Sequence, residues 1–207
     1  MKYNELMLIL VMLLAGGTAV PRTGLAQAET EHHHHHNMAA AGSGYQRSVA
    51  SYKIPDVKFI DINGVESTLR DGLDGNSPVM LNFIFTSCSA ICPVMSATFS
   101  NVQEDLGKES NKVRMVSISI DPENDTPEKL REYAEKFNAG PQWRMLTGSI
   151  KNSIAVQRAF GVFRGDKMSH TPVTFLRARG ANSPWVRLDG LASASEIIGE
   201  YRKLTQK

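Results

Sequence analysis

The sequence predicts an α/β fold in which a central mixed sheet is flanked by helices and preceded by an extra N-terminal β-hairpin. Two nearly continuous apolar runs, residues 79–85 and 113–120, have the length and composition of strands buried on both faces of a sheet. Segments of helical periodicity follow them along the chain. Alternating strands and helices favour parallel strand pairs that are covered by helices on both faces.

The composition is that of a globular chain with one core. Of the 207 residues, 42% are hydrophobic and 21% are charged, which excludes a disordered chain, a collagen-like chain and a multi-span membrane protein. The formal net charge is only +2, so the sequence offers no strongly basic face for the phosphates of a nucleic acid. We therefore expect no nucleic-acid partner.

The first elements are a hairpin, a core strand and a helix. Residues 57–60 alternate apolar and polar side chains and are expected to pair with residues 65–69 across a turn at Asn63 and Gly64. The apolar strand 79–85 leads into a helix over residues 93–106, which ends at Gly107. The second core strand, 113–120, comes next.

The remaining elements continue the alternation. Asp125 and Thr126 are capping residues, and Pro127 suits the first turn of a helix that runs to about residue 137. The other predicted elements are strand 143–146, helix 149–160, strands 173–176 and 185–188 around a turn at 180–182, and helix 195–204. The closing strand pair is expected to give the sheet an antiparallel edge.

The N-terminal region reads as a targeting segment and a linker. Residues 1–28 combine an apolar run with a small-residue cleavage signal, as in a secretory signal peptide, although a retained membrane anchor is the alternative. Residues 29–51 are interpreted as a flexible linker that contains the tract His32 to His36, and residues 52–207 as the folded domain. The tract is either a metal-binding tail or a solvated or tag-like segment. Both interpretations of 1–28 place the domain outside the cytoplasm, for example in the periplasm.

The only two cysteines lie where the first core strand ends. Cys88 falls in the loop after strand 79–85, and Cys92 lies four residues later at the start of a helix. Ligands of open α/β sheets bind at the carboxyl ends of strands, and a helix N-terminus stabilises a thiolate. The two sulfurs can bind a soft metal ion such as Cu(I), or they can close a disulfide.

His170 is the only histidine outside the tract, and it directly precedes strand 173–176. In the predicted topology its loop faces the strand–helix junction of Cys88 and Cys92. Two sulfur donors and one imidazole suit copper in both oxidation states. A lone histidine is more often a satisfied surface or core group, so its ligand role depends on the cysteines.

Nearby acidic and thioether side chains have competing interpretations. For Asp125 we favour turn and capping chemistry, whereas Asp121 fits either a turn or an acidic group beside the cysteines. Met95 is interpreted as a core residue, and Met168 as a candidate auxiliary ligand.

Three motifs together resemble the Sco/SenC family. They are Cys88-x-x-x-Cys92-Pro93, the stretch Ser-Ile-Asp-Pro-Glu-Asn-Asp-Thr at 119–126, and His170 followed by threonine about 50 residues later. Members of that family are copper proteins with a thioredoxin-like fold that help assemble the CuA centre of cytochrome c oxidase. The resemblance covers about residues 54–204, with Ser169 at a position where the family often has an aspartate.

The resemblance implies a thioredoxin-like domain that binds one copper ion, Cu(I) or Cu(II), through Cys88, Cys92 and His170. It implies a metallochaperone, which is not an enzyme, with an apo-cuproprotein acceptor such as cytochrome c oxidase subunit II. A monomer that associates with the membrane through its N-terminus fits this picture.

Two other functions stay open at the level of the sequence. A thiol–disulfide oxidoreductase would use Cys88 and Cys92 as its redox pair to keep acceptor cysteines reduced, and a thioredoxin-like reductant would regenerate it. A peroxidase of the peroxiredoxin type is less compatible, because Thr86 or Ser89 would only loosely replace the threonine and arginine of such sites.

Overall fold

The computed structural model describes residues 44–206. The predicted signal peptide, the histidine tract and the rest of the segment before residue 44 lie outside the described residues, so these predictions stay predictions. Within residues 44–206, none of the helices has the length and apolar character that crossing a bilayer requires.

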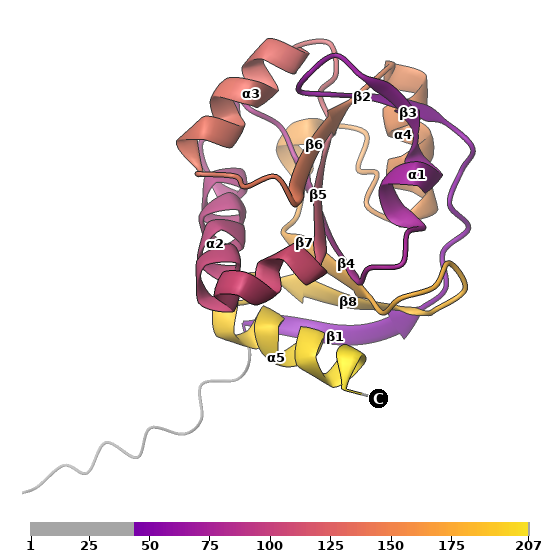
Figure 1. The fold of residues 1–207 in the computed structure, drawn as a ribbon. Coiled ribbons are helices and arrows are strands. Elements are labelled where there is room, and N and C mark those ends of the chain that lie inside the picture. Colours follow the sequence, from indigo (N-terminus) through magenta and orange to yellow (C-terminus); the bar gives the residue numbers. More distant parts are fainter. Residues whose placement is uncertain (1–43, 207) are drawn as a thin grey trace, which may run out of the picture. The chain divides into compact units, whose positions relative to one another are not determined.

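One eight-stranded sheet runs through the domain in the order β1-β8-β7-β4-β5-β6-β2-β3 (Figure 1). Strands β4, β5 and β6 are parallel, and every other neighbouring pair is antiparallel. The strands are β1 (Tyr45–Ala50), β2 (Lys58–Asp61), β3 (Glu66–Thr68), β4 (Val79–Ile84), β5 (Arg114–Ser119), β6 (Trp143–Thr147), β7 (Val173–Arg177) and β8 (Trp185–Gly190). The mixed sheet predicted from the sequence is confirmed.

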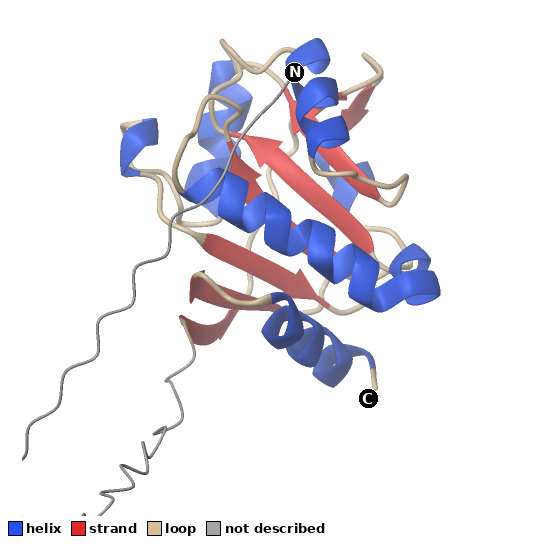
Figure 2. Ribbon diagram, turned by 90° about the vertical axis from the view of Figure 1, so that its left-hand side faces the viewer, coloured by secondary structure: helices blue, strands red, loops and turns tan. Residues whose placement is uncertain are grey.

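Helices cover both faces of the sheet. They are α1 (Leu69–Leu73), α2 (Ile91–Leu106), α3 (Pro127–Lys136), α4 (Ile150–Ala159) and α5 (Ala194–Thr205), with short 3₁₀ turns η1 (Gly107–Lys112) and η2 (Lys167–Ser169). Helices α2, α3 and α5 pack on one face through residues such as Phe99 and Ile197, and α1 and α4 pack on the other through Leu73 and Val156 (Figures 1 and 2). Each face of the sheet carries its own apolar cluster. Because side chains alternate along β4, that strand contributes to both clusters, with Met80 on one face and Leu81 on the other.

The predicted elements lie within about two residues of their expected bounds, and the helix starts have physical causes. Thr126, Ser149 and Ser193 precede α3, α4 and α5, and each side-chain oxygen accepts a backbone N–H from the first turn of its helix. The short helix α1 was not predicted. It begins at Leu69, directly after the expected second strand of the hairpin, which ends one residue early at Thr68. Five residues carry too little periodicity to detect.

The fold begins earlier than the expected residue 52. Strand β1 (Tyr45–Ala50) already pairs along its whole length with β8. The strand is polar, and Val49 is exposed, so it shows no apolar alternation that a sequence pattern would reveal. Backbone pairing and the 2.6 Å ion pair of Arg47 with Glu200 of α5 hold it. The closing strands β7 and β8 consequently lie inside the sheet, and β1 forms the edge.

Candidate metal centre

The two cysteines lie side by side where β4 gives way to α2. Cys88 is half-buried in the connecting loop, and Cys92 is fully buried in the first turn of α2. The backbone N–H of Cys92 donates to the Cys88 sulfur over 3.4 Å, and the N–H of Cys88 donates to the carbonyl of Phe85. Both thiols are free. The loop thus turns the Cys88 sulfur back onto the N-terminus of α2.

The environments of the two thiols differ. Burial tends to raise the pKa of Cys88, but N–H groups of Cys92, Ala90 and Ile91 and the Cys92 side chain offset it, so that the net pKa is lowered. Burial raises the pKa of Cys92 to about 12, and the neighbouring Cys88 and Asp125 add to the effect despite a backbone hydrogen bond at Phe85. Cys88 is therefore the accessible, more acidic thiol, and Cys92 is the protected one.

Asp125 supports the loop that carries Cys88, and the capping interpretation of Asp125 was wrong. Its fully buried carboxylate accepts the backbone N–H of Thr86 over 3.1 Å and the Thr86 hydroxyl over 2.6 Å. The other oxygen accepts the Ser119 hydroxyl over 2.6 Å, and Thr126 caps α3 instead. Asp125 therefore ties the start of the cysteine loop to the end of β5. The sequence signal for this role was an acidic residue soon after a buried strand. Its partner could not be predicted from the local pattern, because Thr86 lies 39 residues away.

His170 is buried, with 8% of its surface exposed, and its ring Nε2 lies 3.0 Å from the backbone carbonyl of Phe83 in β4. A carbonyl only accepts, which assigns the proton of the neutral ring to Nε2 and leaves the lone pair on Nδ1. Burial lowers the pKa of His170, with the positive charge of Arg164 adding to it and the Phe83 carbonyl opposing it, which favours the neutral ring. A neutral imidazole with a free Nδ1 is a competent metal ligand.

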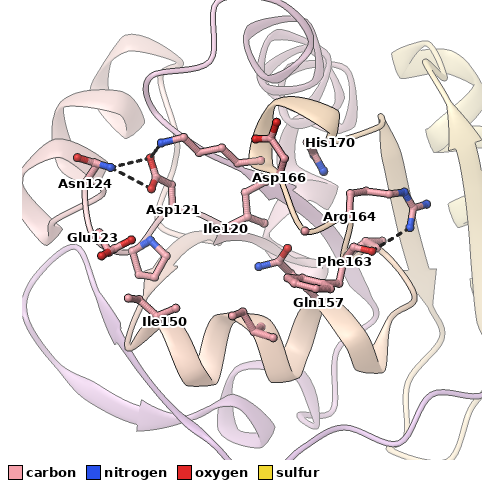
Figure 3. Close-up of a pocket in the computed structure, with 15 residues that line it drawn as sticks. Ile120, Asp121, Glu123, Asn124, Ile150, Gln157, Phe163, Arg164, Asp166 and His170 are labelled. Atoms are coloured by element: carbon pink, nitrogen blue, oxygen red, sulfur yellow. Dashed lines mark hydrogen bonds and ion pairs between the residues drawn. The ribbon is translucent and has the colours of Figure 1, made fainter.

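The described part of the chain does not bring His170 and the cysteines into one preformed cluster. Within residues 44–206, no three His, Cys, Asp or Glu side chains are gathered closely enough to hold a metal ion. His170 instead borders a pocket of about 340 Å³ at the end of β5, whose lining includes Asp121 and Arg164 but neither cysteine (Figure 3). A three-ligand centre therefore stays a prediction, and it requires the turn of His170 or the cysteine loop to move.

The turn that carries His170 is linked to Asp121. The Lys167 ammonium lies 2.5 Å from Asp121 Oδ2, and the amide of Asn124 donates to both oxygens of the same carboxylate. Asp121 is thus an ion-paired, 6% exposed group beside the site, a role that the sequence left open. Met168 is 71% exposed, and its role as an auxiliary ligand stays a prediction, whereas Met95 is buried in the core as expected.

The donor set fits a thiophilic metal ion. Two sulfurs from one short loop and helix turn, together with one imidazole, are the ligand types that select copper or zinc over magnesium or calcium. The same two sulfurs, one accessible and one buried, also fit reversible disulfide chemistry.

Comparison with known proteins gives a consistent assignment. The SCO1/SenC family model matches residues 50–206. The SCO1 protein homolog of Bacillus subtilis is 33% identical over 116 residues, which span 56% of this chain and 59% of the relative. The chain therefore aligns with less than two thirds of that relative's length.

Solved structures share the fold. BsSco, described as a member of the Sco family of cytochrome c oxidase assembly proteins, superimposes with a TM-score of 0.64 and 24% identity over 76% of this chain and 95% of its own. Bradyrhizobium japonicum ScoI, solved with copper bound, gives 0.61 and 24% over 72% and 98%. These likenesses confirm the thioredoxin-like fold. Because the family model spans nearly all of the described domain, the chain belongs to the SCO1/SenC family.

Proposed function

We propose that this protein is an extracytoplasmic copper metallochaperone that delivers copper to the CuA site of cytochrome c oxidase, in subunit II, or to a similar cuproprotein. The observation that carries the proposal is the pair of free thiols at the junction of β4 and α2, where the Cys88 sulfur accepts the backbone N–H of Cys92. Support comes from a relative solved with copper bound and from one described as a cytochrome c oxidase assembly protein.

In this proposal Cys88, Cys92 and His170 hold the cargo. Cys88 is half-exposed and meets the incoming ion or the acceptor first, whereas buried Cys92 closes the site from the core side. His170 contributes Nδ1, since Nε2–H is occupied by the Phe83 carbonyl. Delivery is a ligand exchange that proceeds when the acceptor holds copper more tightly, and no covalent bond of a substrate changes.

The test is a titration of the reduced full-length chain with Cu(I) against a competing chelator, without oxygen. Because His32 to His36 would bind metal themselves, all five are replaced by glutamine in every sample. We expect one tight equivalent, lost on oxidation of the cysteines and abolished by Cys88→Ser, since one thiolate is left. His170→Ala should weaken binding strongly while the fold persists.

Two results would contradict this proposal. A full copper equivalent bound by Cys88→Ser with the tract replaced would remove the two-thiolate site. Unchanged affinity in His170→Ala would remove His170 from the ligand set. The signal-peptide part of the proposal is checked separately by sequencing the N-terminus of the mature protein.

The unequal thiols favour a second candidate function, thiol–disulfide exchange with an acceptor. The Cys88 thiolate attacks an acceptor disulfide, forming a mixed disulfide and releasing one acceptor thiolate. Cys92, after losing its proton, attacks the Cys88 sulfur, which releases the second acceptor thiolate and leaves a Cys88–Cys92 disulfide. A thioredoxin-like dithiol then reduces that disulfide.

The mixed disulfide distinguishes this candidate. Cys92→Ser should trap a covalent adduct with a disulfide-bonded acceptor peptide that carries the CuA cysteines, whereas Cys88→Ser should not. The adduct is detected by mass spectrometry under non-reducing conditions. If neither variant forms an adduct while the native chain binds Cu(I) tightly, the metallochaperone role stands without the reductase role.

A further inference from the structure

Lys167 ties the turn that carries His170 to the end of β5. Its ammonium is 2.5 Å from Asp121 Oδ2, and Asp121 is held in turn by the side-chain amide of Asn124 (Figure 3). The same ammonium lies 5.7 Å from the centre of the Phe85 ring, at the start of the cysteine loop. A single side chain therefore lies near the residues that directly follow β4 and β5, where the site is built.

Lys167 and His170 belong to one hydrogen-bonded turn. The Asp166 carboxylate accepts the N–H of Met168 over 2.9 Å, the N–H of Ser169 donates to the Asp166 carbonyl, and the N–H of His170 donates to the Lys167 carbonyl over 3.1 Å. These bonds close a compact 3₁₀ turn, η2. A displacement of His170 toward the cysteines consequently pulls on the backbone of Lys167 and on its ion pair.

The present position of His170 differs from its position as a ligand. Its ring rests against the Phe83 carbonyl, and within the described residues no three donors are close enough to share a metal ion. Two arrangements of the turn must therefore exist if His170 binds the metal with the cysteines. Any contact that is made in one arrangement and lost in the other biases the equilibrium between them.

We propose that the Lys167–Asp121 ion pair is a latch. It stabilises the position of His170 beside the Phe83 carbonyl and opposes the approach of His170 to the two thiolates. Lys167 is thus a positioning residue of the metal site, an inference that rests on the proposed copper binding. Asp121 is 6% exposed and the Lys167 side chain 36%, so the pair is shielded on its acidic side and open to solvent on its basic side. Dissolved salt therefore weakens the latch without abolishing it.

The test compares Lys167→Gln with Lys151→Gln in the full-length chain, with His32 to His36 replaced as above. Lys151 is an exposed lysine of α4, so its replacement removes the same charge without breaking the ion pair. Binding of Cu(II) alone is followed by stopped-flow absorbance of the thiolate-to-copper charge-transfer band. Lys167→Gln should bind about three- to tenfold faster and more tightly, because a partly exposed ion pair no longer opposes the ligand arrangement.

The His170→Ala background separates the latch from general electrostatics. Removing any positive charge near a cation site speeds cation binding, with or without His170. A latch that acts through His170 gives Lys167→Gln no advantage over Lys151→Gln once His170 is alanine. Lys167→Arg, which keeps the ion pair, should behave as the native chain.

A measurement on the metal-free protein gives an independent readout. Hydrogen exchange of the backbone N–H of His170, followed by NMR, should become faster in Lys167→Gln and stay unchanged in Lys151→Gln. If Lys167→Gln does not fold, a non-coordinating salt added to the native chain replaces it. Salt should then speed Cu(II) binding more in the native chain than in His170→Ala.

Three results would overturn the latch: equal rates in Lys167→Gln and Lys151→Gln, equal acceleration with and without His170, or weaker binding in Lys167→Gln. The last would mean that the ion pair preassembles the site. Failure of the copper proposal looks different, because the native chain would then show no thiol-dependent binding. The exchange rate of His170 would in that case still decide whether Lys167 restrains the turn.

Discussion

At the scale of single residues, the two cysteines have opposite surroundings within one helical turn. Cys88 receives backbone N–H groups from the start of α2 and is half-exposed, whereas Cys92 is enclosed by core side chains and lies near the charge of Asp125. Because only the thiolate is nucleophilic, reactivity at neutral pH should be confined to Cys88. This difference in acidity and exposure between the two thiols suits either the capture of copper or the attack on a disulfide.

Alkylation by iodoacetamide at pH 7 should therefore modify Cys88 at least about 100-fold faster than Cys92. The pKa of Cys88 is lowered and that of Cys92 is raised to about 12, so the thiolate fraction of Cys92 stays negligible at this pH. The rates are measured by mass spectrometry on Cys92→Ser and Cys88→Ser, each with one thiol left. Comparable rates would mean that Cys92 is exposed by motions of the loop.

Asp125→Ala should lower the free energy of unfolding by about 2–4 kcal/mol, because the N–H and hydroxyl of Thr86 and the hydroxyl of Ser119 lose their common acceptor. Urea unfolding of the reduced, metal-free protein measures the change. Asp105→Ala, at an exposed position of α2, is the matched control and should change little. A loss below about 0.5 kcal/mol would show that water replaces the carboxylate.

At the scale of elements, β1 is held to the domain by backbone pairing with β8 and by one ionic cluster with α5. Glu200 is 2% exposed and lies between Arg47 of β1 and Lys203 of its own helix, at 2.6 and 2.7 Å. Burial raises the pKa of Glu200, but the hydrogen bonds from Arg47 and Lys203 outweigh it, and the net pKa is lowered. The carboxylate is thus favoured in the folded state.

Glu200→Gln should lower the free energy of unfolding by about 0.5–1.5 kcal/mol at pH 7. The expected loss is this small because the side chains of Arg47 and Lys203 are exposed and solvent screens their charges. A lowered folded-state pKa stabilises fully above the unfolded-state pKa, near 4.3, and the stabilisation disappears as pH falls through the folded-state value. The difference between Glu200→Gln and the native chain should therefore begin to shrink near the unfolded-state pKa and vanish as pH falls through the lower folded-state pKa. Unfolding curves from pH 7 to 3 measure it. Glu132→Gln on the exposed side of α3 should show no such trend.

At the scale of the whole molecule, the spacing of apolar residues predicted the strands and helices that are stabilised by burying their own side chains. Strand β4 is apolar at nearly every position because helices cover both its faces, and α2, α3 and α5 each carry a stripe that packs on the sheet. Strand β1 was not predicted because its backbone pairs with β8, more than 130 residues away, and its own side chains show no apolar alternation.

The site was predictable in its residue types but not in its arrangement. Cys88 and Cys92 are local in sequence, so their contact follows from one loop and one helical turn. The support by Asp125 and the bond of His170 to the Phe83 carbonyl join segments 39 and 87 residues apart. No short-range pattern encodes such contacts, because they depend on how close the strand ends come after the sheet is assembled.

The direction of β1 decides at which end of the sheet the described chain begins. Tyr45 pairs with Gly190, whose N–H donates to the Pro172 carbonyl, two residues beyond His170. The chain thus enters the sheet at the end where β4 stops and the cysteine loop begins, three strand spacings or about 14 Å away from β4. The strand that closes the edge of the sheet therefore starts at the same end of the domain as the two thiols, although 43 residues of sequence separate Tyr45 from Cys88.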